Sequence, residues 1–200
     1  QMEEAVLEVL PDGSDDFEVA VASVDPTSGA VRAFIGGPEF ADFQFNLVTQ
    51  GSRQPGSSFK TYVLAAAIEK AGLYPFDTIS GVGPCTFPNP PNVDYEVSNF
   101  NDNEGVVGTV QYAVLKSSNC GFVRLGLRTG LDNVVEVANR LLGRDLENSF
   151  RPYLSMSLGA QEVTPLEQAV AYAAIANGGL RMEPHFITRV EDAAGSVIYQ

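Results

Sequence analysis

Apolar and polar positions first alternate between residues 17 and 24, which read FEVAVASV. A run of turn-forming residues, 25–29 (DPTSG), interrupts the alternation, which resumes over residues 30–35 and stops at Gly36 and Gly37. Period-two alternation on both sides of a turn predicts two antiparallel strands, either as a hairpin or as part of a meander.

A helical pattern follows Pro55 and Gly56 and reads SSFKTYVLAAAIEKA over residues 57–71. Its apolar residues recur three or four positions apart, as on one face of a helix: Phe59, Val63, Ala66 and Ala67. Because Pro-Gly breaks the chain before this segment and Gly72 follows it, the sequence predicts a helix over residues 57–71.

Apolar periodicity predicts three more helices, over residues 109–116, 119–127 and 131–142, with Thr109 as the N-cap of the first. Residues 164–167 (TPLE) form a capping box with proline at the first helical position. The helix that they begin should run to residue 177, where Gly178 and Gly179 follow. It contains the longest apolar run, residues 169–176, which is far shorter than the ~20 residues needed to span a bilayer.

Two regions lack a long regular pattern. Residues 73–108 are rich in Pro, Gly and Asn, and we interpret them as long ordered loops whose aromatic residues need packing partners: Phe76, Phe87, Tyr95 and Phe100. Residues 185–190 and 197–199 are expected to pair as a final hairpin. The order of strands, helices and strands predicts an α+β fold, with an antiparallel sheet flanked by a helical layer.

The composition is that of a globular protein, with 44% hydrophobic and 18% charged residues in a chain of 200. The net charge is −13, and acidic residues crowd positions 3–18, which we interpret as a solvated surface. A chain this acidic is a poor partner for nucleic acid or anionic lipid, so no nucleic-acid partner is expected.

The histidine and cysteine content restricts the chemistry further. The chain has one histidine, His185, and two cysteines, Cys85 and Cys120, which do not form a C-x-x-C pair. This set is too small for a structural zinc site, so no metal is expected. A Ser-His-Asp triad would depend on His185, and no G-x-S-x-G sequence accompanies it.

Ser57 and Lys60 form the chain's single S-x-x-K sequence. A serine hydroxyl needs a base within reach to act as a nucleophile, and residues three apart share a helix face, so Lys60 should reach Ser57. The helix N-terminus would stabilise an oxyanion, and burial would favour the neutral lysine. This spacing is common on exposed helices, but here it stands where Pro55 and Gly56 start a helix.

Residues 117–119 (SSN) are the single S-x-N triplet, sixty residues after Ser57. A functional interpretation gives Ser117 a proton-relay role and Asn119 a substrate-holding amide. The alternative is a polar turn that ends a helix.

The surroundings of both motifs resemble a known family. Residues 53–60 (RQPGSSFK) are similar to the block around the active serine of class A, bifunctional penicillin-binding proteins. Residues 25–37 resemble the family's strand pair, and Phe45-Asn46 its approach to the serine. Residues 157–167 and 171–179 resemble its late helix block. The resemblance covers residues 17–200, so residues 1–16 are expected to be a linker from a preceding region.

The resemblance implies a D-alanyl-D-alanine transpeptidase that cross-links peptidoglycan stem peptides through an acyl-enzyme. Ser57 would be the nucleophile and Lys60 its base, with Ser117 and Asn119 completing the catalytic and substrate-binding site. β-Lactam antibiotics would acylate Ser57. The family also implies no cofactor and an extracytoplasmic location, anchored to the cell membrane by a segment outside this chain.

The family's third motif, Lys-Thr-Gly on a sheet strand, is not found in the chain. The nearest string, residues 128–130 (RTG), ends a predicted helix. We therefore expect the fold to be incomplete here, and expect a C-terminal segment of the same domain, as a second chain or as further sequence, to pair with residues 17–35.

Cys85 and Cys120 lie in the sequences GPCTF and SSNCGF, which resemble an actinobacterial branch of the family. The oxidising location implied by the family predicts a disulfide between them, and two buried free thiols are the alternative.

Other functions stay open beside the transpeptidase. A non-catalytic penicillin-recognising or wall-binding module would keep Ser57 and Lys60 without turnover, and a DD-carboxypeptidase would transfer the acyl group to water. A β-lactamase would need an efficient deacylating base, and the nearby acids, Glu162 and Glu167, lie in a segment that we interpret as a structural cap.

Overall fold

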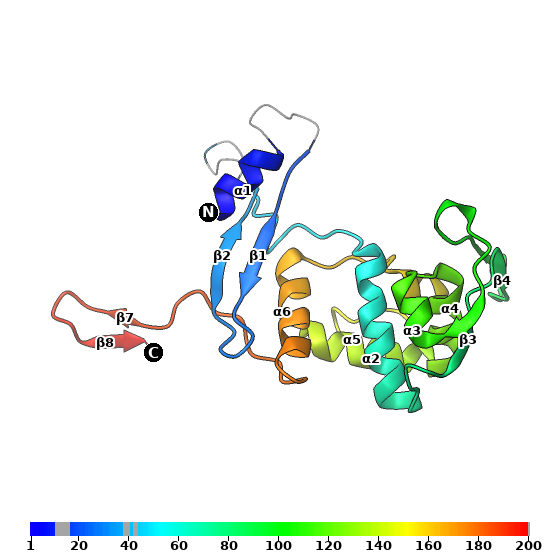
Figure 1. The fold of residues 1–200 in the computed structure, drawn as a ribbon. Helices are drawn as coiled ribbons and strands as arrows, with labels where there is room; N and C mark the ends of the chain where they lie inside the picture. The colour runs from blue at the N-terminus through cyan, green and yellow to red at the C-terminus, as the bar shows by residue number, and fades with distance from the viewer. Residues whose placement is uncertain (11–16, 38–40, 42–43, 200) are drawn as a thin grey trace. The chain divides into compact units, whose positions relative to one another are not determined.

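The computed structural model describes residues 1–10, 17–37, 41 and 44–199 (Figure 1). The chain divides into two compact units, one made of residues 1–52 and 163–200 and the other of residues 53–162. The elements are short antiparallel strand pairs and helices, which confirms the predicted α+β class.

The first unit contains the predicted strand pair. Its elements are α1 (Met2–Val9), β1 (Val21–Val24), β2 (Val31–Ile35), α6 (Pro165–Ala176), β7 (Val190–Glu191) and β8 (Val197–Tyr199). β1 and β2 are antiparallel, with Val21 opposite Ile35. Among the described residues they pair with each other alone, apart from a parallel bridge between Ala30 and His185, so the sheet is not closed.

The expected N-terminal linker contains a helix, and the C-terminal tail contains two short strands. Residues 2–9 of the expected linker form helix α1, whereas residues 11–16 lie outside the described part of the chain. The tail hairpin is confirmed as β7 and β8, but its first strand begins at Val190. His185 instead joins the bridge to Ala30.

Helix α6 begins and ends as its sequence predicts. The Thr164 hydroxyl accepts a hydrogen bond from Glu167 N at 3.1 Å, and the Glu167 carboxylate accepts one from Thr164 N at 2.7 Å. This reciprocal capping box stabilises the first turn, and Asn177 caps the other end. None of the helices in the described ranges is long and apolar enough to cross a membrane.

The second unit carries the two motifs. It consists of η1 (Gly56–Phe59), α2 (Lys60–Ala71), β3 (Thr78–Ser80), β4 (Cys85–Phe87), β5 (Tyr95–Val97), η2 (Phe100–Asp102), β6 (Val107–Thr109), α3 (Val110–Leu115), α4 (Asn119–Thr129), α5 (Leu131–Leu142) and η3 (Leu154–Leu158). Helix α2 packs against α4 and α5, which places the two motif-bearing helices side by side (Figure 1).

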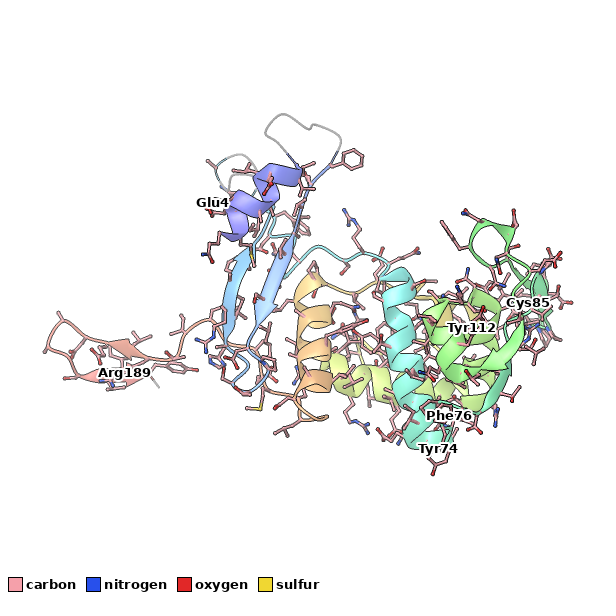
Figure 2. All side chains as sticks on the ribbon, viewed as in Figure 1. Glu4, Tyr74, Phe76, Cys85, Tyr112 and Arg189 are labelled. Carbon is pink, nitrogen blue, oxygen red and sulfur yellow. A yellow bond between two sulfur atoms is a disulfide. The ribbon has the colours of Figure 1, made fainter. Side chains whose placement is uncertain are left out.

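Residues 73–108 contain more regular structure than predicted. β3 pairs with β6, and β4 with β5, each over three residues. Strands this short show no recognisable alternation, so the sequence pattern does not reveal them. The expectation that all four aromatic residues pack is wrong for two of them, because Phe76 is 78% and Phe100 81% exposed. Phe76 is labelled in Figure 2.

The predicted disulfide joins Cys85 at the start of β4 to Cys120 in the first turn of α4. It lies within a buried cluster whose members come from the β4–β5 pair, α4 and η3: Cys85, Phe87, Val97, Cys120, Val123 and Leu154. The loop segment is therefore tied covalently, and by packing, to the residue after Asn119.

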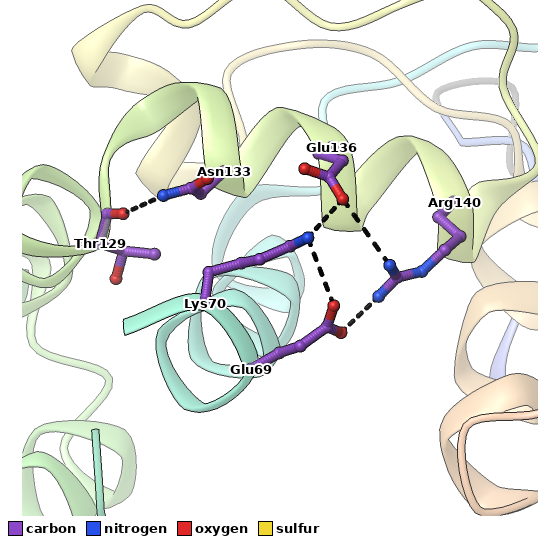
Figure 3. Close-up of polar contacts among 6 residues, drawn as sticks. All are labelled: Glu69, Lys70, Thr129, Asn133, Glu136 and Arg140. Atoms are coloured by element: carbon purple, nitrogen blue, oxygen red, sulfur yellow. Dashed lines mark hydrogen bonds and ion pairs between the residues drawn. The ribbon is translucent and has the colours of Figure 1, made fainter. Parts of the chain in front are cut away.

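An ion-pair network covers the exposed side of the α2–α5 contact (Figure 3). The Lys70 ammonium pairs with the Glu136 carboxylate, and the Arg140 guanidinium with the Glu69 carboxylate. The guanidinium of Arg140 lowers the pKa of Glu69. All four side chains are solvent-accessible, so we expect the network to contribute little to stability.

Candidate active site

Ser57 lies in the 3-10 turn η1, one turn before Lys60 begins α2. Gly56 takes a left-handed conformation, with φ of 56°, and its N–H donates to the carbonyl of Gly159 at 3.2 Å. A Cβ atom at position 159 would lie 2.1 Å from the Gly56 oxygen, so this close backbone approach needs glycine. The neighbouring Ser58 hydroxyl donates to the Pro55 carbonyl at 2.7 Å, which ties it into the turn.

Lys60 is buried, with 4% of its surface exposed, and its ammonium donates three hydrogen bonds. Nζ lies 2.7 Å from the Ser117 carbonyl, 3.1 Å from the Ser117 hydroxyl and 2.7 Å from Asn119 Oδ1. These contacts use all three N–H bonds of the ammonium. The Phe122 ring centroid lies 5.4 Å from Nζ and adds a cation–π contact.

Ser57, Lys60 and Ser117 line one cavity of about 170 Å³, whose other lining residues are Thr61, Leu64, Val114 and Phe122. We expected the S-x-x-K spacing to bring Ser57 against Lys60. The two residues share the cavity, but the ammonium's hydrogen bonds go to residues 117 and 119. The 3-10 geometry of η1 explains part of this difference, because Ser57 precedes the α-helical turn that Lys60 opens.

Burial lowers the pKa of Lys60 from 10.5 to about 8. Desolvation disfavours the charged form, as predicted for a lysine held among apolar neighbours. At pH 7 about one-tenth of the molecules then carry a neutral Lys60, which has a lone pair available to accept a proton.

Ser117 occupies a backbone position that usually takes glycine. Its φ is 48°, in the left-handed region. The N–H of Ser117 donates to the Val114 carbonyl at 3.0 Å, and the N–H of Ser118 donates to the Ala113 carbonyl at 2.9 Å. These two bonds form a Schellman motif at the end of α3, with Ser117 at its left-handed position. The strained turn points the serine's own carbonyl and hydroxyl at Lys60.

Asn119 bridges Lys60 and the loop segment. Its Oδ1 accepts from Lys60, and its Nδ2 donates to the Ser98 carbonyl at 2.9 Å. It is the first residue of α4, which Ser118 caps by accepting a hydrogen bond from Gly121 N at 3.1 Å. The S-x-N sequence is therefore both the polar turn of the alternative interpretation and a set of ligands for the lysine.

Sequence reasoning proposed Ser57, Lys60, Ser117 and Asn119. In the structure Lys60 contacts Ser117 and Asn119, and Ser57 lines the same cavity as Lys60. Sequence reasoning missed Phe122 and the Ser98-Asn99 dipeptide. Their sequence signal is weak, because asparagine is frequent throughout residues 73–108 and the contact to α4 exists in space alone.

Known proteins match most of this chain. The family model for the penicillin binding protein transpeptidase domain matches residues 19–200. The chain belongs to this family. The predicted resemblance is confirmed, together with the transpeptidase fold that it implied.

The relatives include class A proteins of the 1A type. Penicillin-binding protein 1A of Aquifex aeolicus is 32% identical over 191 residues, which cover 96% of this chain and 25% of that protein. Penicillin-binding protein 2D of Bacillus subtilis is 31% identical over 210 residues, which cover 99% of this chain and 28% of that protein. The chain thus spans about a quarter of the length of these relatives.

Two solved structures have similar folds. Penicillin-binding protein 1A of Haemophilus influenzae has a TM-score of 0.83 and 30% identity, over 91% of this chain and 27% of that one. PonA1 of Mycobacterium tuberculosis in complex with penicillin V has a TM-score of 0.83 and 28% identity, over 98% of this chain and 53% of that one. The expected actinobacterial branch is not confirmed by these matches.

Proposed function

We propose that this chain carries the acyl-transfer site of a D-alanyl-D-alanine transpeptidase, with Ser57 as the nucleophile and Lys60 as its base. The observation that carries the proposal is the environment of Lys60. The lysine is buried and has a lowered pKa, it shares one cavity with Ser57 and Ser117, and it also donates to Asn119.

In the proposed acylation, the Ser57 oxygen attacks the carbonyl carbon of the penultimate D-alanine while neutral Lys60 takes the hydroxyl proton. N–H groups in the first turn of a helix lack intrahelical partners, so the Ser57 amide can stabilise the developing oxyanion. The peptide C–N bond then breaks, and the Ser117 hydroxyl relays a proton from Lys60 to the leaving amine. The products are a Ser57 ester and free D-alanine.

The remaining parts of the proposal concern partners and location. Peptidoglycan stem peptides would be the substrates, Asn119 would hold the peptide backbone, and a neighbouring stem-peptide amine would release the acyl group. β-Lactam antibiotics would form the same ester, and no metal or cofactor is needed. We also propose an extracytoplasmic location, a linker role for residues 1–16 and completion of the site by a C-terminal segment.

The proposal is tested by intact-mass analysis of the full-length protein after exposure to a fluorescent penicillin. One covalent adduct is expected, located on Ser57 by peptide mapping and absent from Ser57→Ala. The matched control is Ser58→Ala, which removes the adjacent hydroxyl bound to Pro55 and should keep the adduct. A label that persists in Ser57→Ala would reject the assignment.

A second measurement separates the alternatives. Transfer of the acyl group from a stem-peptide donor to an added amine supports a transpeptidase, and transfer to water alone supports a DD-carboxypeptidase. An adduct that forms without any turnover of peptide substrate supports a penicillin-recognising module.

A further inference from the structure

We infer that Asn99 is a positioning residue for this site. It holds the segment that carries Ser117 and Asn119 at the place where both reach Lys60. The inference rests on the proposed function, because the effect of Asn99 is measured through acylation of Ser57. Asn99 itself lies outside the cavity that Ser57 lines, just before η2, and is 8% exposed.

The side-chain amide of Asn99 makes four hydrogen bonds. Its Oδ1 accepts from the Ser118 hydroxyl at 3.1 Å and from Cys120 N at 3.2 Å. Its Nδ2 donates to the carbonyls of Gly81 at 2.9 Å and Asn103 at 3.0 Å. The full capacity of an amide is thus used, and two carbonyls on one side with an N–H on the other fix which atom is nitrogen.

The two groups bound to Asn99 Oδ1 belong to residues on either side of Asn119. Asn99 therefore holds the chain before and after this residue, through Ser118 and Cys120. The preceding carbonyl, that of Ser98, accepts from the Asn119 side chain. One dipeptide consequently fixes both the backbone and the amide of Asn119, whose Oδ1 meets Lys60.

The segment needs such a restraint because Ser117 is in a strained conformation. A non-glycine residue with φ of 48° costs energy and persists where its surroundings determine it. The Schellman bonds hold this turn from the α3 side, and Asn99 holds it from the loop side through Ser118. Movement of the turn would carry the Ser117 carbonyl and hydroxyl away from Lys60.

The backbone around the Asn99 side-chain amide is tightly packed at two glycines, Gly83 and Gly105. A Cβ atom at Gly83 would lie 3.0 Å from Asn99 Nδ2 and 3.0 Å from Cys120 Sγ. A Cβ atom at Gly105 would lie 2.1 Å from the Gly81 oxygen that Nδ2 binds. Glycines at both positions let the backbone approach the amide closely on this side.

The test compares Asn99→Ala with Asn139→Ala in the full-length protein. Asn139 is a matched control within the same unit: its amide donates to Ser149 Oγ at 2.7 Å and accepts from Phe150 N at 3.2 Å, and it does not line the Ser57 cavity. The measured quantity is the second-order rate constant for acylation by a fluorescent penicillin, at a temperature where each variant is folded.

We expect Asn99→Ala to lower this rate constant at least about tenfold, because small displacements of catalytic groups have large effects on rate. Asn139→Ala should stay within about twofold, even if both variants lose similar thermal stability. In a Lys60→Ala background, Asn99→Ala should have a smaller effect than in wild type, because a residue that acts partly through Lys60 shows non-additivity.

Three results would overturn the inference: acylation of Asn99→Ala within twofold of wild type, equal losses in the two asparagine variants, or additive effects of Asn99→Ala and Lys60→Ala. If Asn99→Ala does not fold, Asn99→Asp replaces it. This variant keeps the oxygen that binds Cys120 N but cannot donate to Gly81, so a wild-type rate would again overturn the inference. Wild-type protein that fails to acylate at Ser57 would instead reject the proposed function.

Discussion

Lys60 Nζ and Asn119 Oδ1 lie 2.7 Å apart, although 59 residues separate them in sequence. This hydrogen bond joins the first residue of α2 to the first residue of α4. It links the S-x-x-K and S-x-N motifs directly. The buried lysine therefore has a fixed position beside the second motif.

The first prediction concerns the base. Lys60→Ala should lower the acylation rate constant by about 10²–10⁴-fold, the range typical of a general base. Lys70→Ala is the matched control, because Lys70 lies on the same helix and pairs with Glu136 at the surface. Stopped-flow or mass-spectrometric acylation kinetics measure both variants. Similar rates for wild type and Lys60→Ala would show that another group activates Ser57.

The second prediction concerns pH. Because burial lowers the pKa of Lys60 to about 8, the reactive neutral form increases as pH rises through 8. The acylation rate constant should therefore fall about tenfold per pH unit below 8 and level off above it. A profile from pH 6.5 to 9.5, corrected for hydrolysis of the β-lactam, measures this midpoint. A flat profile would contradict Lys60 as the base.

The lowered pKa of Lys60 also makes the stability of the fold depend on pH. The unfolded chain, with its ordinary lysine pKa of 10.5, binds more protons than the folded chain between pH 8 and pH 10.5. Stability should therefore rise with pH across this window through Lys60, and Lys60→Met should remove that contribution. Denaturant unfolding of wild type and Lys60→Met at pH 7.5 and 9.5 measures the difference in unfolding free energy.

The third prediction separates the two roles of Ser117. Ser117→Gly and Ser117→Ala both remove the hydroxyl, so both should lower turnover of a stem-peptide substrate to a similar extent. Glycine tolerates the left-handed conformation, with φ of 48°, that alanine resists. The glycine variant should therefore be about 1 kcal/mol more stable than the alanine variant. Equal stabilities in urea unfolding would argue against strain at this position.

The fourth prediction concerns the amide of Asn119. Asn119→Ala should weaken substrate positioning, so acylation should slow while the fold remains intact. Asn133→Ala is its control, because the Asn133 amide donates to the Thr129 carbonyl (Figure 3) and Asn133 does not line the cavity. Unchanged acylation in Asn119→Ala would favour the interpretation of residues 117–119 as a turn without a catalytic role.

The parts of this structure that the sequence predicts have strong local signals. Helix α5 matches its predicted bounds, since an apolar face runs between Gly130 and Gly143. The α6 capping box is likewise a four-residue signal. By contrast, β3 pairs with β6 across about thirty residues, and three-residue strands contain too few positions to show a period.

The sequence predicted the residues of the candidate site but not the hydrogen bonds between them. Resemblance to the family named Ser57, Lys60, Ser117 and Asn119 together, whereas the S-x-x-K spacing by itself suggested a contact between Ser57 and Lys60. The left-handed turn at Ser117 escapes sequence reasoning because the residue expected there is glycine. The role of Asn99 depends on contacts with residues up to 21 positions away.

The final prediction concerns the disulfide between Cys85 and Cys120. The bond closes a loop with a sequence separation of 35 residues, for which chain-entropy loss in the unfolded state gives roughly 4 kcal/mol of stabilisation. Urea unfolding of oxidised and reduced wild type measures this effect with both sulfur atoms kept in the core. Cys85→Ala/Cys120→Ala should lose more stability, because both side chains are buried and their removal leaves space. Reduction should also slow acylation, since Cys120 N is one of the two groups that Asn99 holds beside Asn119. Equal unfolding free energies with and without reductant would show that packing alone fixes the loop segment to α4.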